Sequence, residues 1–395
     1  MVKKVLIVTY GGGHSKLMLP VIRELMTNKE LEIIILALTT SVNDYKYLGL
    51  KLYGYKDFFF SEEALVYGKE LVTSLENVMD LDESIIYLGQ NFKELVDRFG
   101  LKKAKELYKK AGRQVFDPID SMGEILDQVK PDVVVITDSP RSERAIGFSA
   151  KIRKIPILML IGLFPFRGIN WLSNNSISDK VCVFSKEIRQ ILIDAGRNEN
   201  SVIVTGNPTF DEFIRERDRL KVANSNTNES SSFKILWASQ IEPEYCFDID
   251  KQGNPNLPVL IENELIRLCS LHSNWELIAR NHPNEVARIY PRGVYVSKPS
   301  EPLIDVLNKV DCVVTTASAV GLQGAILGVK LITVDCSILT AYTPYSEVGL
   351  SIGVQNISDL ESALIHVADE LNGQDSIYEI NNSAELISKE IVSLI

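Results

Sequence analysis

The sequence predicts an α/β protein with two domains, each built on a doubly wound parallel sheet. Short, continuous apolar runs alternate with segments whose apolar residues recur at helical spacing. The same alternation starts again after residues 221–232, KVANSNTNESSS, a polar stretch typical of a linker or a disordered loop. A length of 395 residues suits two or three domains of ordinary size.

The first block begins with a predicted strand at residues 4–10, a glycine turn and a helix at 17–28. Further strands are predicted at 32–40, 131–138, 155–162, 180–185 and 201–208, with helices at 142–154 and 186–196. Residues 43–128 lack a strong strand pattern and contain predicted amphipathic helices at 63–78, 83–99 and 121–129. We expect this stretch to be a helical insertion on the first domain.

The second block repeats the pattern. Strands are predicted at 233–239, 275–283, 293–297, 311–316 and 329–335, and helices at 257–271, 301–310 and 318–328. We predict an N-terminal domain over residues 1–208, a C-terminal domain over 209–380, and an amphipathic helix at 381–395 that can cross back to the first domain. Ligands of open α/β sheets bind beyond the carboxyl ends of the strands, so a cleft between the domains is the first place to look.

The composition, 45% hydrophobic and 24% charged, is that of an ordinary globular protein. A net charge of -10 argues against general binding to nucleic acid. The five cysteines are scattered and form no CxxC pair, which indicates buried thiols in a reducing compartment and not disulfides or metal ligands. No signal-peptide pattern precedes the first strand, and the longest apolar stretch, residues 155–166, is too short to span a bilayer. We expect a cytoplasmic protein, with peripheral membrane contact and a homodimer left open.

The glycine turn, Gly11-Gly12-Gly13, is the first candidate binding element. Glycines after a strand allow a tight turn and the close approach of a ligand to the backbone, and the following helix points its N–H groups at that place. His14 could act there as a general base or orient a substrate hydroxyl. The pattern differs from GxGxxG, and no acidic residue ends the second strand, which argues against a nicotinamide cofactor, and no cofactor is predicted. A purely structural turn is the alternative.

Two motifs of the second block can bind phosphate. In ARNHPNE, residues 279–285, Arg280 and His282 follow a strand, and the guanidinium offers a forked pair of donors. In TTASAVGLQGAILG, residues 315–328, a strand ends in hydroxyl residues and Ser318 is placed to cap the next helix. The N-terminus of such a helix suits a diphosphate. Loop packing and helix capping alone are the alternatives.

In the order of these motifs the chain resembles the GT-B nucleotide-sugar enzymes over nearly its whole length. GGGH followed by Pro20 is similar to the opening of the lipid II N-acetylglucosaminyltransferase and the plant galactolipid synthases. TGNPTFD, residues 205–211, is similar to UDP-N-acetylglucosamine 2-epimerases and lipid A disaccharide synthase. HPNEV and the 315–334 segment are similar to the nucleotide-binding half of the 2-epimerases, and also resemble CDP-glycerol transferases and bacterial sialyltransferases.

This resemblance implies a GT-B fold and a set of site residues. Backbone N–H groups near Ser318 would bind the donor phosphates, His282 and Arg280 would line that pocket, and Gln323 stands where these families usually have a ribose-binding Glu. His14 and the glycine loop would face the acceptor or the transferred sugar. The complete candidate set for nucleotide or substrate binding is Gly11, Gly12, Gly13, Asn207, Gln240, Arg280, His282, Thr316, Ser318, Ala319 and Gln323.

The candidate catalytic residues are His14, with Asp138 and Glu143 as acidic groups after the neighbouring strand. No metal ligand is predicted, because no Asp-x-Asp motif ends a strand and no His/Cys cluster occurs. The 2-epimerases usually carry His-x-Glu-Ala-Gly after the fourth strand, where this chain reads LMLIGLFPFRG. We therefore expect a metal-independent glycosyltransferase that uses a UDP- or CMP-linked sugar and a sugar or lipid-linked acceptor. A 2-epimerase-like enzyme and a non-catalytic nucleotide-sugar-binding protein are the alternatives.

Overall fold

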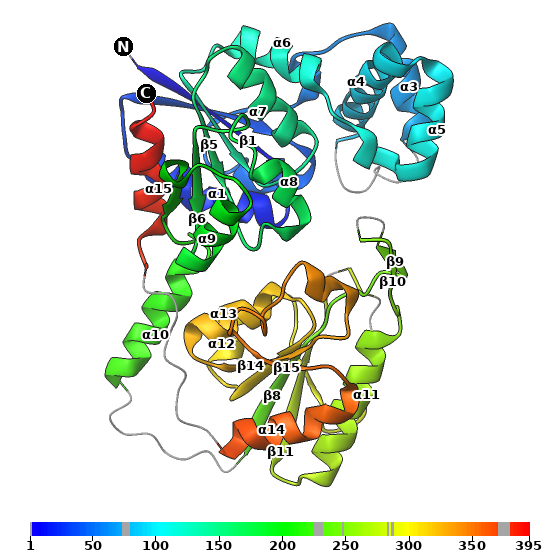
Figure 1. Cartoon of the computed structure of the whole chain (residues 1–395), viewed down its shortest axis with the longest axis vertical. Helices are drawn as coiled ribbons and strands as arrows, with labels where there is room; N and C mark the ends of the chain where they lie inside the picture. The colour runs from blue at the N-terminus through cyan, green and yellow to red at the C-terminus, as the bar shows by residue number, and fades with distance from the viewer. Residues whose placement is uncertain are drawn as a thin grey trace. The chain divides into compact units, whose positions relative to one another are not determined.

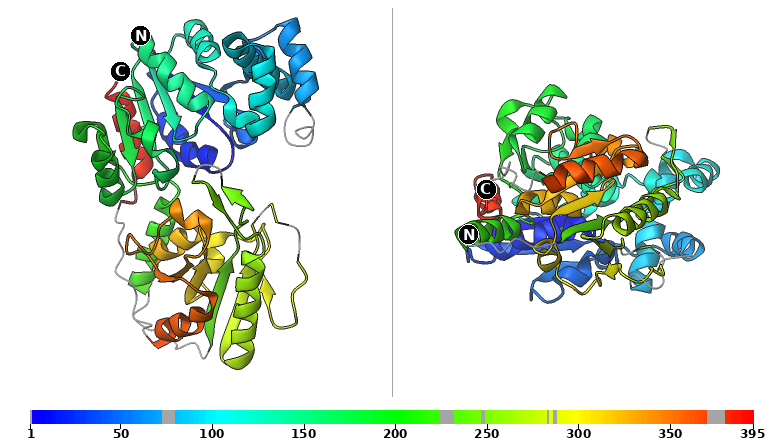
Figure 2. Two further views of the ribbon diagram at one scale, coloured as in Figure 1. Left: turned by 45° about the vertical axis from the view of Figure 1, so that its right-hand side comes forward. Right: turned by 90° about the horizontal axis from the view of Figure 1, so that it is seen from below.

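The computed structural model describes residues 2–72, 80–223, 232–246, 249–282, 284–285, 288–369 and 380–395. Most of the predicted linker, residues 224–231, and the end of the helix predicted at 63–78 lie outside these ranges. The chain divides into two compact units: unit 1 comprises Met1–Thr209 and Asn382–Ile395, and unit 2 comprises Phe210–Asn381. Figures 1 and 2 show an α/β arrangement in each unit.

Unit 1 contains a seven-stranded parallel sheet of order β3-β2-β1-β4-β5-β6-β7. In that order the strands are β3 (Lys51–Tyr53), β2 (Leu31–Ala37), β1 (Lys3–Thr9), β4 (Val133–Thr137), β5 (Ile157–Leu160), β6 (Lys180–Val183) and β7 (Val202–Val204). The chain order reverses direction between β1 and β4, whose carboxyl ends are therefore the expected ligand site of this sheet.

Helices cover both faces of this sheet. One face packs on α1 (Gly13–Leu25) and α15 (Ser383–Val392) through a shared core that includes Ile7, Met18 and Ile387. On the other face α7 (Ser142–Ile152) approaches Ile136 so closely that a Cβ on Gly147 would meet that side chain at 3.3 Å. The C-terminal helix α15 thus belongs to unit 1, where Lys180 also pairs with Glu390 at 2.5 Å.

A helical group projects from the sheet of unit 1 and contains α3 (Glu62–Leu71), α4 (Leu81–Phe99) and α5 (Leu101–Ala111) (Figure 1). The helices α3 and α4 cross at two glycines: a Cβ on Gly89 would lie 1.8 Å from the Ala64 carbonyl oxygen. The group is anchored by Glu94 of α4, which accepts hydrogen bonds from Asp120 and Ser121 of α6 (Ile119–Val129). The other short helices of the unit are α2 (Val42–Tyr45), α8 (Ile169–Leu172) and α9 (Lys186–Asp194).

Unit 2 contains a six-stranded parallel sheet of order β12-β11-β8-β13-β14-β15. In that order the strands are β12 (Tyr295–Val296), β11 (Trp275–Arg280), β8 (Phe233–Ala238), β13 (Cys312–Thr315), β14 (Lys330–Val334) and β15 (Ile352–Val354). The order reverses between β8 and β13, as it does between β1 and β4. A separate antiparallel hairpin pairs β9 (Tyr245–Cys246) with β10 (Lys251–Gln252).

The helices of unit 2 also lie on both faces. Trp237 and its neighbours pack on α11 (Leu257–Leu271) and α14 (Leu360–Asp369), whereas α13 (Ala319–Leu327) approaches Val313 and Leu331 on the opposite face. The remaining helices are α10 (Asp211–Ala223) and α12 (Leu303–Leu307). The predicted fold class is confirmed, because both sheets are parallel and covered by helices on two sides.

The structure differs from the sequence prediction at the sheet edges. The strand β3 lies inside residues 43–128, where we predicted only a helical insertion, and β15 and the β9–β10 hairpin were not predicted. These strands are two or three residues long and bury only Cys246 and Val354, so they lack a continuous apolar run. Cys336 is exposed and Cys269 is half-buried, so the prediction of buried thiols is wrong for these two cysteines. Among the described residues, no helix combines the length and the hydropathy needed to cross a bilayer.

Candidate active site

The three glycines after β1 are required for different reasons. A Cβ on Gly11 would lie 1.8 Å from Thr40 Oγ1, so packing excludes a side chain there. Gly12 has φ 74° and ψ -130°, a conformation almost restricted to glycine, and it precedes the first residue of α1. Gly13 is different: it is helical, and a Cβ there would meet no atom within 4 Å. The structure itself therefore gives no reason for glycine at residue 13.

His14, in the first turn of α1, reaches the end of β4. Its Nδ1 lies 2.8 Å from Thr137 Oγ1 and 3.6 Å from Asp138 Oδ1, and its side chain is one-third exposed. The two candidates His14 and Asp138 thus lie together at the point where the strand order reverses.

Glu143, on α7, is fully buried beneath these residues. Its carboxylate accepts hydrogen bonds from Tyr10 N at 2.8 Å, Thr137 N at 2.6 Å and Thr137 Oγ1 at 2.6 Å. It therefore ties the ends of β1 and β4 together. Burial raises the pKa of the Glu143 carboxyl, and the nearby His14 and the donated hydrogen bonds oppose this shift.

These contacts determine which His14 nitrogen carries a proton. The hydroxyl of Thr137 has one proton, and while Glu143 is ionised that proton is donated to Glu143. The lone pair of Thr137 Oγ1 then accepts from His14 Nδ1–H. A neutral imidazole has one donor and one acceptor nitrogen, so Nε2 of His14 is left unprotonated. An unprotonated Nε2 on this partly exposed ring can accept a proton from a substrate hydroxyl.

Asp138 supports the same histidine. Burial raises the pKa of the Asp138 carboxyl, whereas the proximity of His14 and a backbone hydrogen bond from Gly162 lower it. The Gly162 carbonyl in turn accepts from Asn207 Nδ2 at 2.6 Å, and Asn207 Oδ1 accepts from Thr209 N at 2.9 Å. The amide of Asn207 is thus engaged in holding the loop behind Asp138, and its predicted nucleotide contact stays a prediction.

Sequence reasoning did not identify Thr137, Tyr10 or Arg141 as site residues. The Tyr10 hydroxyl donates to Ser142 Oγ at 2.9 Å, and the Arg141 guanidinium lies over the Tyr10 ring at 4.5 Å from its centroid. Arg141 also has φ 69°, which is rare for a side chain of its size. The segment TDSPRSER offered only one signal, its position at the carboxyl end of a predicted strand.

In unit 2 the candidate residues around Ser318 form the N-terminus of α13. Ser318 Oγ accepts from Val320 N at 3.3 Å, which confirms the predicted cap, and Ala319 is the first helical residue. Thr316 is 2% exposed, and its Oγ1 has no hydrogen-bond partner in the described part of the chain. A buried hydroxyl normally has a hydrogen-bond partner, so Thr316 Oγ1 can bond to a water or a ligand oxygen here.

Gln323, in the second turn of α13, and Gln240, after β8, are half-buried. Neither side chain has a hydrogen-bond partner within the ranges that the structure describes. The carboxyl ends of β8 and β13 are adjacent in the sheet, so Gln240 and Ser318 both lie at the reversal point of unit 2.

The loop after β11 holds His282 in a defined tautomer. His282 Nδ1 accepts from Asn284 N at 3.2 Å, so the neutral ring carries its proton on Nε2 and can donate it. Glu285 accepts from His282 N at 2.7 Å and from Ser239 Oγ at 2.8 Å, and it also pairs with Arg288. This half-buried glutamate ties the end of β8 to the loop after β11. Sequence reasoning quoted Glu285 within ARNHPNE but gave it no role.

Arg280 is directed toward the sheet edge. Its Nη1 donates to Ser297 Oγ at 2.7 Å, and both Nη atoms lie 3.3 Å from the Glu301 carbonyl oxygen. Those contacts occupy much of its guanidinium, and its predicted phosphate contact stays a prediction. No group of three or more His, Cys, Asp or Glu side chains suited to a metal ion occurs among the residues that could be searched.

Comparison with solved structures places this geometry in a known fold. The UDP-GlcNAc 2-epimerase of Methanocaldococcus jannaschii superposes with a TM-score of 0.58 at 16% identity, covering 99% of each chain. The UDP-GlcNAc 2-epimerase of Neisseria meningitidis, solved with UDP-GlcNAc, gives a TM-score of 0.61 at 15% identity over 99% of this chain and 100% of the other. A glycotransferase of kitacinnamycin gives 0.59 at 13% identity over 100% and 99%.

The chain has the GT-B fold. No protein-family model and no curated protein sequence matches it. The resemblance to GT-B nucleotide-sugar enzymes drawn from the sequence is therefore confirmed at the level of the fold, and the chemistry must be argued from the site.

Proposed function

We propose that this protein is a glycosyltransferase that moves a sugar from a nucleotide diphosphate to an acceptor hydroxyl. The observation that supports this most directly is the hydrogen-bond chain Glu143–Thr137–His14, which leaves His14 Nε2 as a proton acceptor. Transfer to a hydroxyl needs such a base, and a positioned base contributes about 10²–10⁴-fold to a rate. In this proposal Glu143 and Thr137 position His14, and Asp138 stabilises the imidazolium that forms.

The donor diphosphate is assigned to unit 2. The first turn of α13, the unpartnered Thr316 hydroxyl and the Nε2–H of His282 offer hydrogen-bond donors to phosphate oxygens. A helix N-terminus favours negative charge, so these groups would also stabilise the departing nucleotide diphosphate. The GT-B structures solved with UDP-GlcNAc or UDP support a UDP-sugar as the donor.

A 2-epimerase activity is the second candidate. It is favoured by the two acidic groups beside His14, Asp138 and Glu143, whose pKa values are raised by burial. Inversion at a sugar C2 requires a proton to leave one face and return to the other, and a pair of carboxyls can serve as the acid and the base. The solved 2-epimerases with this fold add weight to it.

One experiment separates the candidates. The protein is incubated in D2O with each of a panel of UDP- and CMP-sugars, with and without cell extract as acceptor source. Nucleotide release that depends on acceptor, with hydrogen retained at C2, is the result expected for transfer. Deuterium at C2 without acceptor would identify the epimerase reaction instead. Calorimetric binding without either reaction would indicate a nucleotide-sugar-binding protein that lacks catalysis.

A further inference from the structure

The helix α5 presents an unusually basic face. Its sequence LKKAKELYKKA contains five lysines and one glutamate, an excess of four positive charges in a chain whose net charge is -10. Ala104 is fully buried and Tyr108 packs on Phe92 with ring centroids 5.7 Å apart, so the inner face of the helix is engaged with α4. The lysines lie on the remaining arc and are exposed: Lys102, Lys103, Lys105, Lys109 and Lys110.

Few of these charges are neutralised. Lys103 lies 3.5 Å from Glu106, and Lys105 lies 3.9 Å from Glu70. In the described part of the chain, Lys102, Lys109 and Lys110 have no carboxylate within ion-pair distance. Because like charges on one helix face repel one another, such a face is stabilised by an anionic partner.

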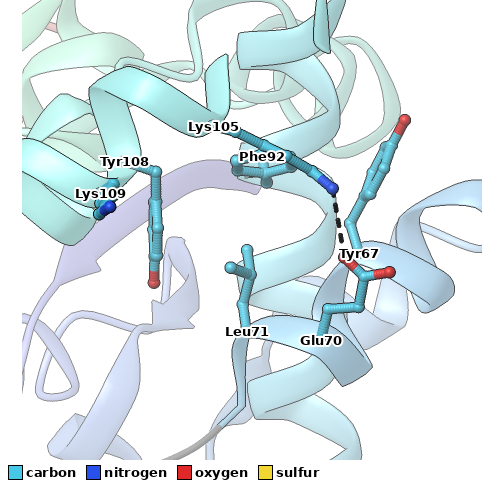
Figure 3. A pocket seen from close by; sticks show the side chains of 7 residues that line it. All are labelled: Tyr67, Glu70, Leu71, Phe92, Lys105, Tyr108 and Lys109. Carbon is cyan, nitrogen blue, oxygen red and sulfur yellow. Dashed lines mark ion pairs between the residues drawn. The ribbon is translucent and has the colours of Figure 1, made fainter. Parts of the chain in front are cut away.

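Apolar groups adjoin the lysines. Phe99 is 53% exposed and Leu101 is 44% exposed at the N-terminal end of α5. A pocket of about 180 Å³ opens along the same helix, lined by Tyr67, Leu71, Phe92 and Tyr108, with Glu70, Lys105 and Lys109 also lining it (Figure 3). An exposed ring and an exposed leucine, an apolar pocket and lysines together match a partner surface that is anionic outside and apolar beneath.

We propose that the α5 face, defined as the five lysines with Phe99, Leu101 and the adjoining pocket, docks on an anionic lipid bilayer. Lipid phosphates would pair with the lysines, while Phe99 and Leu101 enter the headgroup region. Nucleic acid fits less well, because exposed aliphatic and phenyl groups beside the charges gain nothing from a phosphodiester backbone. The proposal goes beyond glycosyl transfer and does not depend on it, since docking requires no nucleotide sugar.

The test is co-sedimentation of the full chain with vesicles. Vesicles of equimolar phosphatidylglycerol and phosphatidylcholine should bind the protein, binding should fall as salt rises, and phosphatidylcholine vesicles should not bind it. Each basic residue near an anionic surface contributes about fivefold, so losing three lysines in K102E/K109E/K110E should weaken binding roughly 100-fold or more.

A matched variant controls for net charge. K29E/K251E/K298E changes the charge by the same amount at exposed lysines outside the α5 face and should bind almost as the wild type does. F99S/L101S should weaken binding and leave the residual binding salt-dependent. Circular dichroism checks that each variant is folded, and the wild-type salt titration stands without any variant. Failure of the wild type to bind the anionic vesicles, equal loss in both triple variants, or tighter binding to a single-stranded oligonucleotide than to vesicles would overturn the proposal.

Discussion

The two units of this chain share an arrangement of a glutamate and a histidine, but the histidine Nε2 is a proton acceptor in one unit and a proton donor in the other. In each, a glutamate ties adjacent strand ends and a histidine stands at the carboxyl edge of the sheet: Glu143 with His14, and Glu285 with His282. In unit 1 the ring Nδ1 faces a hydroxyl whose proton is already donated, which leaves Nε2 as an acceptor. In unit 2 the ring Nδ1 accepts a backbone N–H, which leaves Nε2 as a donor. In our proposal, therefore, residue type alone does not distinguish a base from a phosphate ligand; the hydrogen-bond partner of ring Nδ1 does.

The largest effect is expected at His14. His14→Asn removes the unprotonated Nε2 and should lower turnover by about 10²–10⁴-fold, with the affinity for UDP unchanged, because the nucleotide is assigned to unit 2. Steady-state kinetics and calorimetry with UDP measure the two quantities. Full activity in this variant would remove His14 from the mechanism.

The corresponding substitution in unit 2, at His282, should change the affinity for UDP. His282→Ala removes an Nε2–H donor to phosphate, and a hydrogen bond to a charged group contributes about 1.5–3 kcal/mol. The affinity for UDP should fall accordingly, whereas His14→Asn leaves it unchanged. His272→Ala is the control in the same unit, because that ring stacks on Trp275 at 4.0 Å and pairs with Glu361. Equal losses in both variants would indicate a general effect on the fold.

Substitutions of Thr137 test how the proton on the His14 ring is positioned. Thr137→Val keeps the shape of the side chain but leaves His14 Nδ1 without its partner and Glu143 with one donor fewer. We expect turnover to fall and the free energy of unfolding to fall by about 1–3 kcal/mol. Thr137→Ser retains the hydroxyl and should restore turnover. A valine variant with normal turnover would show that the ring is oriented by Asp138 alone.

The comparison also explains what the sequence could predict. The inner strands are continuous apolar runs, and the residues after them had to lie at the carboxyl edge, so His14, Asp138, Glu143, Ser318 and His282 could be named. Their individual roles could not. Glu143 was predicted as a catalytic group, yet it is fully buried and its two oxygens receive three donors, which makes it a positioning residue in our proposal. Thr137 was missed because a threonine at the end of a strand is unremarkable until its distances to a ring and a carboxylate are known.

A change in pH is expected to have a smaller effect, on the free energy of unfolding. Burial raises the pKa of Asp138 in the folded chain above its ordinary value of 3.8. A carboxyl whose folded pKa is raised contributes stability below its unfolded pKa, and this contribution is lost as pH rises through the folded value. The wild type should therefore lose stability relative to Asp138→Asn over that interval. In a His14→Asn background the loss should be larger, since the imidazolium no longer favours the ionised carboxyl. Urea unfolding at a series of pH values measures both differences.

The smallest structural change is the addition of one methyl group, and it should have different effects at Gly12 and Gly13. Gly13 is helical with open space around its Cβ position, so Gly13→Ala should leave the free energy of unfolding unchanged or raise it by up to about 1 kcal/mol. Gly12→Ala should instead lower it, because φ 74° strains a residue with a side chain. If a ligand approaches the backbone at residue 13, the alanine there must still reduce turnover although the fold is intact. Thermal unfolding and kinetics on the two variants test this directly. A Gly13→Ala protein with unchanged turnover would mean that the ligand does not contact the first turn of α1, and that His14 reaches its substrate from the side of Asp138.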